Sequence, residues 1–253
     1  MRMAHIVQVY LDIDSHICVN RAWRPTTEWV KNRLDLFKRL TLPSLLKQEF
    51  NGFRIWLLCG NEHKKITSKH RLMPKVEIFY DLGKTALASV DADYLAVTRL
   101  DSDDLLHRYA MREILRNVRP TDRRDCLIFR TYLVWDTNQR FIIRVRRNSP
   151  CFITHIFPRE IYKDWPEFQA QHFLWHEKAG GRDPRTRELM RDMACAVKHT
   201  NNFGNLKKNE EAALVKNIKE LRKKHGFYTN EASGMLETLR NFGLTKKEFE
   251  RWQ

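Results

Sequence analysis

Three aspartates stand almost side by side in the middle of the chain. The segment TRLDSDD places Asp101, Asp103 and Asp104 within four residues, directly after an apolar run that predicts a buried strand. Carboxylates crowded in this way repel one another unless a cation lies nearby. Because Mg²⁺ and Mn²⁺ prefer oxygen ligands, the spacing favours a divalent metal site. A structural alternative is that Asp103 or Asp104 caps a helix beginning near Leu105, which accounts for only one of the three acids.

A second acidic position follows the first apolar run of the chain, HIVQVYLDI at residues 5–13, which contains Asp12. Strands and helices alternate along the first half of the sequence, a pattern typical of a mainly parallel sheet with right-handed crossovers. Ligands of such sheets bind beyond the carboxyl ends of the strands. We therefore expect Asp12 to lie at the same sheet edge as Asp101 and Asp103, as part of the ligand site.

The elements that must position these acids are indicated by hydrophobic periodicity. Apolar β-rich runs predict strands at residues 5–13, 53–60, 75–80 and 93–100, and helical spacing predicts helices within residues 27–50 and 105–118. We expect the first of these helices to be interrupted at Pro43, which lacks a backbone donor. Three further β-rich runs, at residues 126–135, 140–146 and 151–157, favour an antiparallel hairpin extension. From residue 206 the chain is rich in Lys and Glu and helical, so we predict a main domain over 1–205 and a basic helical extension over 206–253.

Composition bounds the class of protein. With 253 residues, 42% of them hydrophobic, the chain can bury one sizeable core. It has no uninterrupted apolar stretch of about 18 residues and no secretory signal pattern, which favours a cytoplasmic protein without a membrane span. The five cysteines are scattered, which favours buried thiols over a zinc site or disulfides. A net charge of +15 favours polyanionic partners, although a solvated basic face is an equally simple explanation.

Three segments resemble a known family. VTRLDSDDLLH (97–107) resembles the DxD region of GT-A glycosyltransferases and, within them, the rhamnosyltransferase-like group with its Arg–Leu–Asp–x–Asp–Asp pattern. RLDLFKRLTLPSLLKQEFNGFRIWLLCG (33–60) is similar to the helix–PSL–Q–strand unit that precedes it there, and MACAVKHTNNFGN (193–205) to a late segment with a histidine. The resemblance covers roughly residues 27–205.

The resemblance implies a GT-A, Rossmann-like α/β fold and transfer of a sugar from a nucleotide-sugar to a hydroxyl group. It implies that Asp101 and Asp103 flank an Mn²⁺ or Mg²⁺ ion and the donor ribose, with His199 completing the metal coordination. It places Arg99, and less directly Arg33, near the donor diphosphate, for which a planar guanidinium is suited. UDP-sugars are the commonest donors of this fold.

A catalytic base is harder to assign. Transfer with inversion needs a carboxylate or imidazole that removes the proton of the acceptor hydroxyl. Candidates are His176 and Glu177, within QHFLWHEK at residues 171–178, and Asp164. Transfer with retention needs no such base.

Arginines are concentrated between the acids and the second half of the chain. Those that we expect to contact a polyanion are Arg123, Arg124, Arg144, Arg146 and Arg147. Our preferred acceptor is DNA that carries a hydroxymethylated pyrimidine, as in phage DNA modification, which requires the base to be flipped out of the duplex. The alternative acceptor is a cell-surface glycan.

Two other classes of protein remain as alternatives. LDIDS (11–15) resembles the nucleophile motif of haloacid-dehalogenase-like phosphohydrolases, although Ser15 stands where Gly is usual. A non-catalytic nucleic-acid-binding module explains the positive charge, but it leaves the clustered acids without a purpose.

Overall fold

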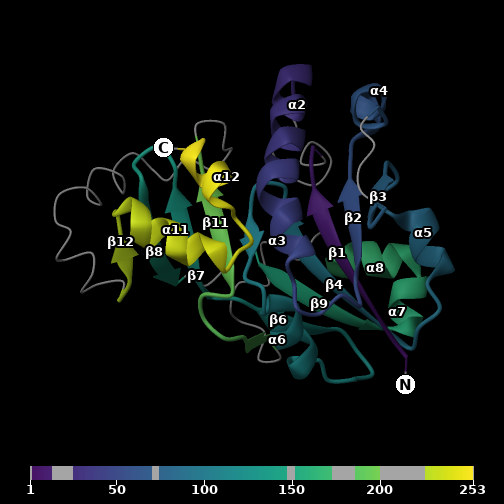
Figure 1. Cartoon of the computed structure of the whole chain (residues 1–253). Helices are drawn as coiled ribbons and strands as arrows, with labels where there is room; N and C mark the ends of the chain where they lie inside the picture. The colour runs from purple at the N-terminus through teal and green to yellow at the C-terminus, as the bar shows by residue number, and fades with distance from the viewer. Residues whose placement is uncertain are drawn as a thin grey trace.

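Two β-sheets organise the chain (Figure 1). The computed structural model describes residues 2–12, 25–69, 74–146, 152–172, 186–199 and 226–252. The larger sheet has the strand order β10-β6-β9-β4-β1-β2-β3, and the smaller sheet has the order β12-β8-β7-β11-β5. The strands of the larger sheet are β1 (Met3–Tyr10), β2 (Arg54–Leu58), β3 (Val76–Phe79), β4 (Tyr94–Asp101), β6 (Asp125–Ile128), β9 (Ile153–Pro158) and β10 (Thr186–Glu188). Those of the smaller sheet are β5 (Leu105–Leu106), β7 (Thr131–Asp136), β8 (Phe141–Arg146), β11 (Ala194–Lys198) and β12 (Tyr228–Thr229).

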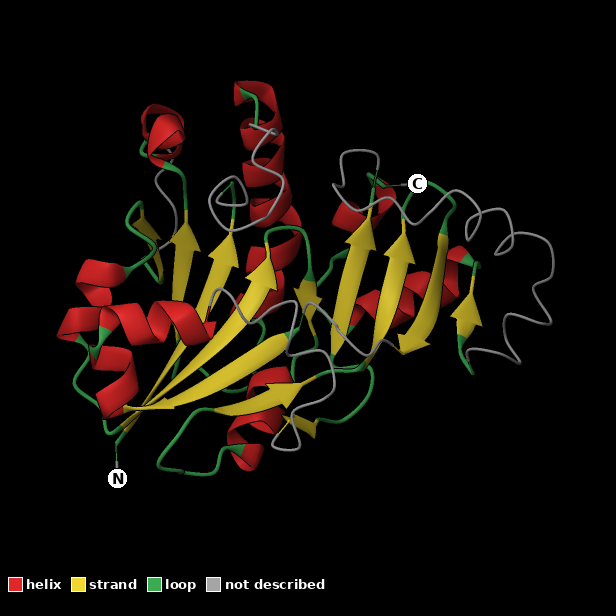
Figure 2. Ribbon diagram, turned by 180° about the vertical axis from the view of Figure 1, so that it is seen from behind, coloured by secondary structure: helices red, strands yellow, loops and turns green. Residues whose placement is uncertain are grey.

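The larger sheet is mainly parallel, as the sequence predicts. Strand β1 pairs in parallel with β2 and β4, and β2 pairs in parallel with β3. Strand β9 is the exception, because it is inserted antiparallel between β4 and β6. Most arrowheads of this sheet therefore lie at one edge (Figure 2). The α/β fold class is confirmed.

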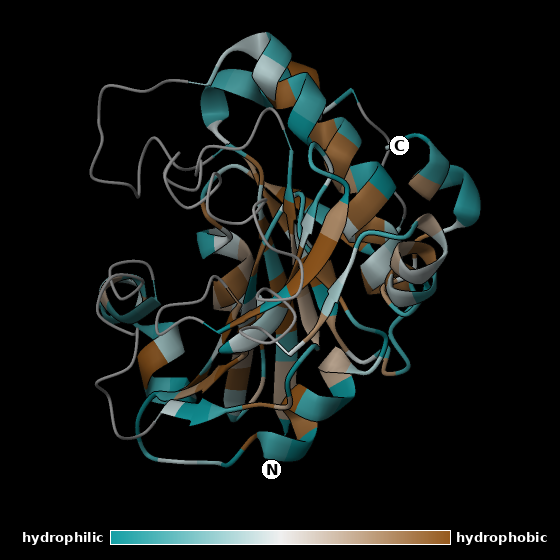
Figure 3. Cartoon of the chain, turned by 90° about the vertical axis from the view of Figure 1, so that its left-hand side faces the viewer, coloured by the Kyte–Doolittle hydropathy of each residue, from teal (hydrophilic) through white to brown (hydrophobic). Residues whose placement is uncertain are grey.

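Helices cover both faces of the larger sheet. On one face α2 (Thr27–Leu36), α3 (Leu42–Leu46) and α6 (Ala110–Asn117) pack on buried side chains of β1, β2 and β4. On the other face the cover comes from α5 (Lys84–Ser89), α7 (Arg159–Lys163) and α8 (Trp165–His172). Apolar residues lie along the strands and on the helix faces that meet them (Figure 3). This layered burial supplies most of the hydrophobic stabilisation of the fold.

The helix at residues 27–46 is not broken at its proline. Between α2 and α3 the chain continues as a π-helical stretch, η1 (Phe37–Thr41), and Pro43 lies in the first turn of α3. Pro43 has no backbone N–H group and cannot donate a helical hydrogen bond. The wider π-helical turn that precedes it accommodates the missing bond without ending the helix. The predicted interruption is therefore a local widening, and it leaves α2 in line with α3.

The smaller sheet contains the predicted hairpin, formed by β7 and β8. Two predictions about its surroundings were wrong. Residues Leu105 and Leu106 form β5, which pairs with β11, so the following helix starts at Ala110. The run at 151–157 forms β9 of the larger sheet and takes no part in the extension.

The described part of the C-terminal region packs on the smaller sheet. Helices α11 (Ala232–Arg240) and α12 (Lys246–Glu250) share a buried apolar cluster with β7, β8 and β11 and with Leu36 and Leu40. Residues 206–225, which carry most of the predicted tail helix, lie outside the described residues. Across the described segments, none of the helices combines the length and apolar character that a membrane crossing requires.

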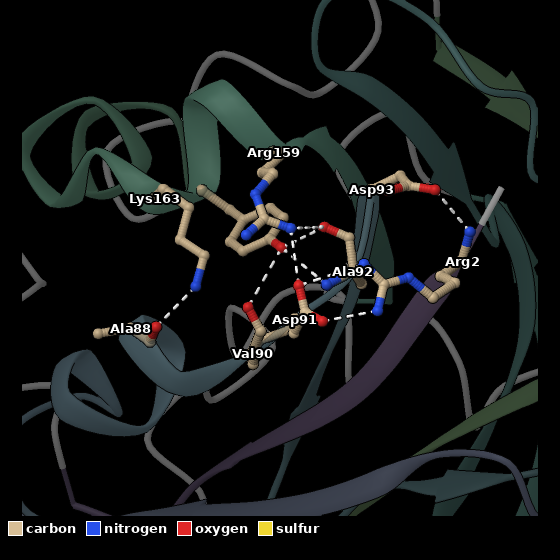
Figure 4. A network of polar contacts seen from close by, with 9 residues as sticks. Arg2, Ala88, Val90, Asp91, Ala92, Asp93, Arg159 and Lys163 are labelled. Atoms are coloured by element: carbon tan, nitrogen blue, oxygen red, sulfur yellow. Dashed lines mark hydrogen bonds and ion pairs between the residues drawn. The ribbon is translucent and has the colours of Figure 1, made fainter.

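The amino end of the larger sheet is closed by a polar network (Figure 4). The Asp91 carboxylate accepts hydrogen bonds from Arg159 at 2.9 Å and from Arg2 at 2.6 Å, and these contacts lower its pKa to about 2. The Arg2 amide also donates to Asp93, and Tyr162 donates to the backbone beside Asp91. These groups join α7 to the starts of β1 and β4, so this edge is held by structural contacts.

Candidate functional site

The acid loop, residues 101–104, lies at the carboxyl edge of the larger sheet. Asp101 ends β4 and pairs with Tyr10, the last residue of β1. The chain then turns, with the Asp104 amide donating to the Asp101 carbonyl at 3.2 Å. Asp103 and Asp104 are 4% and 5% exposed, whereas Asp101 is half-buried. The turn therefore directs two carboxylates into the protein and leaves the third at its border.

Asp103 is bound by two side chains from distant parts of the sequence. Arg33 of α2 donates to its Oδ2 atom, and His199, which follows β11, places Nε2 at 3.0 Å from the same oxygen. The side chains of Arg33 and Asp103 are only 10% and 6% exposed. Of the predicted site residues, the structure thus brings together Arg33, Asp101, Asp103 and His199.

The buried acids differ in charge state. Burial acts to raise the pKa of Asp103, but the Arg33 charge and the His199 hydrogen bond outweigh it and hold that pKa below its usual range. Burial, together with the charges of Asp103 and Asp101, raises the pKa of Asp104 well above its usual range. Asp104 accepts a hydrogen bond from the Val197 amide at 3.1 Å, so it ties the acid loop to β11. Neither acid caps α6, whose N-cap position is Tyr109.

The acid loop contains oxygen ligands that a divalent cation could use. Asp103 Oδ2 and His199 Nε2 are 3.0 Å apart, which is the length of an ordinary hydrogen bond; two adjacent ligands of an octahedral ion at about 2.1 Å lie about as far apart. Within the described residues, however, no group of three or more His, Cys, Asp or Glu side chains is arranged to hold a metal. Asp103 and His199 are thus two donors of suitable chemistry, and a cation bound there would need its further ligands from substrate oxygens and water, as Mg²⁺ sites commonly use.

A buried polar network lies behind the acid loop. Arg99, on β4, has its guanidinium carbon 4.5 Å from the centre of the Tyr10 ring. The Tyr10 hydroxyl lies 3.2 Å from His172 Nε2, which is 2.7 Å from Gln8 Oε1. The Nδ1 atoms of His172 and His155 are 3.0 Å apart. Gln8, Tyr10 and His155 were not predicted as site residues, although Gln8 and Tyr10 are polar groups at alternate positions of an apolar strand, a pattern that could have indicated them.

Asp12 anchors a neighbouring loop. Its carboxylate accepts hydrogen bonds from the Gly60 amide at 2.6 Å and from His63 Nδ1 at 2.7 Å, and burial raises its pKa. Both oxygens are engaged, which disfavours a role as the nucleophile of a phosphohydrolase; Asp14 of that motif lies outside the described residues. The position at the carboxyl edge agrees with the sequence expectation for Asp12.

The anchored loop lines a pocket of about 280 Å³ at the carboxyl ends of β2 and β3. Its walls include Gly60, Asn61, Tyr80, Asp81, Lys84 and Trp165. Strands β4 and β2 are separated by β1 alone. At about 4.8 Å per strand, the ends of β2 and β3 lie about 10 to 14 Å from the end of β4 along this edge, and the pocket is bordered by α5 and α8, on the face of the sheet opposite to α2.

The predicted bases are not brought to the acid loop within the described residues. Asp164 is exposed and caps α8, because its Oδ1 atom accepts from the Glu167 amide at 3.2 Å. It lies at the end of α8 opposite to His172, roughly 10 Å along the helix. His176 and Glu177 lie outside the described residues.

The predicted DNA-binding arginines fall into two groups. Arg124 is 8% exposed and donates to the Gln171 carbonyl at 3.2 Å. Arg144 forms a fork-like pair with Asp192, with Nε 2.7 Å from Oδ1. Because these two side chains are committed to internal contacts, the prediction that they contact DNA does not fit the structure.

The other two described arginines remain accessible. The side chains of Arg123 and Arg146 are 68% and 59% exposed, with surface ion pairs to Asp122 and Glu188. The Arg123 pair is a weak surface pair, whereas Arg146 donates from both terminal nitrogens to the two oxygens of Glu188, a bidentate geometry that is stronger. Arg147 lies outside the described residues.

Comparison with known proteins gives a similarity of fold only. No protein-family model and no curated protein matches the chain. Solved structures that resemble it include S. aureus TarS, residues 1–349, with 18% identity over 78% of this chain and 60% of that one and a TM-score of 0.38. Others are Rv0371c from Mycobacterium tuberculosis, with 13% identity, 86% and 100% coverage and a TM-score of 0.39, and the inositol-1-phosphate CTP transferase from T. maritima, with 12% identity, 86% and 98% coverage and a TM-score of 0.36. At these TM-scores the likenesses carry no argument about the activity of the chain.

Proposed function

We propose that the protein is a glycosyltransferase that takes a sugar from a nucleotide-sugar, of the GT-A type that the Arg–Leu–Asp–x–Asp–Asp pattern resembles. The observation that carries the proposal is the acid loop at the carboxyl edge of the sheet, where Asp103 meets His199 and Arg33. Crowded acids facing a histidine and an arginine provide both a cation site and a phosphate site. A nucleic-acid-binding module has no need of this arrangement.

The pocket beside the acid loop completes the donor site in this proposal. The diphosphate lies over the acid loop, and the nucleoside occupies the pocket between Gly60 and Tyr80. In this proposal Asp101, which is half-buried at the border of the acid loop, accepts hydrogen bonds from the ribose, as the family resemblance implies.

A divalent ion, Mn²⁺ or Mg²⁺, would be held by Asp103 and His199. When bound, such an ion neutralises the charge that develops on the departing diphosphate. Arg99, stacked on Tyr10, adds a second positive charge near the same edge of the sheet.

We propose DNA with a hydroxymethylated pyrimidine as the acceptor, with a cell-surface glycan as the alternative. The proposal is supported by the net charge of +15 and by the exposure of Arg123 and Arg146. If DNA is the acceptor, its binding to the protein weakens steeply as the salt concentration rises. Arg123→Ala and Arg146→Ala should each reduce the slope of log affinity against log salt concentration by about one, the contribution of one phosphate contact. Arg159→Ala, an exposed arginine at the amino edge, serves as the matched control. DNA binding that is absent at low salt removes the DNA acceptor and leaves the glycan.

A panel of nucleoside diphosphates in a thermal-shift assay, with and without Mn²⁺, tests the donor half. A ligand of the folded state raises the melting temperature by mass action. We expect at least one diphosphate to raise it only with Mn²⁺ present, and Asp103→Asn to abolish the shift. Asp35→Asn, on the same helix as Arg33 but 58% exposed, should keep it. If no nucleotide shifts the wild-type protein, the glycosyltransferase proposal is wrong.

A further inference from the structure

The Arg33 guanidinium contacts the same Asp103 oxygen to which the proposed divalent cation would bind. Its guanidinium donates to Asp103 Oδ2, the same oxygen that lies 3.0 Å from His199 Nε2. Arg33 belongs to α2 and is seventy residues away from Asp103 in the sequence. Its guanidinium carbon lies 5.3 Å from the centre of the Trp29 ring. Arg33 is thus a built-in counter-ion of the acid loop, held between an aromatic ring and a carboxylate.

The hydrogen bonding of this arginine is incomplete. Arg33 is 9% exposed, and its buried Nε atom has no hydrogen-bond partner within the part of the chain that the structure describes. The Oγ atom of Ser102, inside the acid loop, is likewise buried and without a partner among those residues. A buried donor without an acceptor is destabilising, and a guanidinium has a planar fork of donors that suits phosphate oxygens. The unused donor therefore points to an anionic ligand at this place.

Asp103 Oδ2 cannot serve Arg33 and a divalent ion equally well. Two positive groups on one buried carboxylate oxygen repel each other strongly at short range. The fit of Asp103 and His199 as adjacent ligands requires that same oxygen. A carboxylate that binds a metal can still accept a hydrogen bond, but the repulsion between the two positive groups weakens the Arg33 contact when the ion is bound, and the Arg33 contact weakens binding of the ion.

We propose that Arg33 exchanges partners during the binding of the donor. Before binding, it neutralises Asp103 and keeps the acid loop folded. When a divalent cation takes Asp103 Oδ2, the guanidinium leaves that oxygen and pairs with the diphosphate of the donor, which satisfies its unused N–H group. The second half of this exchange rests on the proposed function, whereas the competition at Asp103 does not.

The exchange predicts effects of opposite sign from one substitution. Arg33→Gln removes the competitor, so Mn²⁺ without nucleotide should bind about ten- to a hundredfold more tightly, the range that corresponds to loss of one charge-assisted hydrogen bond. The same substitution removes a phosphate ligand, so UDP at saturating Mn²⁺ should bind about tenfold more weakly. A residue with a merely structural role would weaken both.

Titration calorimetry of the full chain with Mn²⁺ alone, and then with UDP at saturating Mn²⁺, measures both effects. Arg39→Gln is the matched control, because Arg39 lies on the same continuous helix and pairs with Asp35 and Glu248 outside the acid loop; it should bind both ligands as the wild type does. Circular dichroism checks that each variant is folded. If Arg33→Gln does not fold, Arg33→Lys replaces it, since it keeps the charge and loses the planar fork, and UDP should then bind several-fold more weakly.

The outcomes separate the two proposals. Mn²⁺ affinity that is unchanged or weaker in Arg33→Gln, or UDP affinity that is unchanged in Arg33→Gln or Arg33→Lys, overturns the exchange. Tighter Mn²⁺ binding in Arg33→Gln, with no nucleoside diphosphate of the thermal-shift panel bound by the wild type, supports the competition at Asp103 and contradicts the proposed function.

Discussion

A buried histidine at the centre of the larger sheet makes the stability of the protein dependent on pH. His5 of β1 is 3% exposed, and its Nε2 atom lies 2.8 Å from Thr98 Oγ1. Its Nδ1 atom is buried without a hydrogen-bond partner among the described residues. Burial lowers the pKa of His5 from 6.5 to about 4, because a charged ring would lose its solvation.

The direction and size of the effect follow from linkage. Between pH 6.5 and 4 the unfolded chain binds a proton at His5 that the folded chain does not, so stability falls as the pH falls. One pKa unit corresponds to about 1.4 kcal/mol. The difference between the pKa of His5 in the unfolded and folded states therefore contributes about 3 kcal/mol to the free energy of unfolding at neutral pH, and about 2 kcal/mol of this is lost by pH 5.

Urea unfolding of the wild type and of His5→Gln at pH 7 and pH 5 measures this loss. Glutamine retains a hydrogen-bonding group and does not titrate, so the free energy of unfolding of the variant should fall less between the two pH values, by about 2 kcal/mol. All other titrating groups cancel in this difference. If both chains lose the same free energy on acidification, His5 is not held neutral by burial and the reasoning is wrong.

Two substitutions test how the acid loop and the sheet are supported. Gln48→Leu removes a buried side-chain amide whose Nε2 donates to the Leu106 and His107 carbonyls and whose Oε1 accepts from the Met111 amide. We expect the free energy of unfolding in urea to fall by about 3 kcal/mol. A fall of under 1 kcal/mol would contradict the role of this amide. Gly83→Ala places a Cβ atom 2.6 Å from the buried Trp56 ring at a backbone φ of +80°, so the melting temperature should drop by several degrees, corresponding to about 2 kcal/mol. An unchanged melting temperature would mean that the ring can move.

Local patterns were sufficient to predict the central strands of the larger sheet. The runs at β1, β2 and β4 are apolar and rich in β-branched residues because both faces of these strands are largely buried. Strand β3 lies at the edge of the sheet and is only half-buried, but its alternation of apolar and polar residues still predicts a strand. Strand β5 was missed because Leu105 and Leu106 continue an apolar spacing that helices also show. The position of β9 depends on pairing with β4 across more than fifty residues of chain, which no local pattern encodes.

The site was predictable where it is local and not where it depends on distant contacts. The spacing of the acid loop indicated the carboxyl edge of the sheet, where the structure places it. The resemblance to a known family suggested Arg33 and His199, but their contacts with Asp103 span seventy and ninety-six residues. The burial of Arg124 and the pair between Arg144 and Asp192 could not be foreseen either. Charge in a sequence does not reveal which side chains the fold will neutralise internally.

The most direct test of the central claim is a crystal structure of the protein grown with UDP and Mn²⁺, with the metal located by its anomalous scattering. We expect an ion bonded to Asp103 and His199, a diphosphate over the acid loop within reach of Arg33, and the nucleoside between Gly60 and Tyr80. An acid loop that contacts neither ion nor nucleotide, with Arg33 still on Asp103, would contradict the central claim.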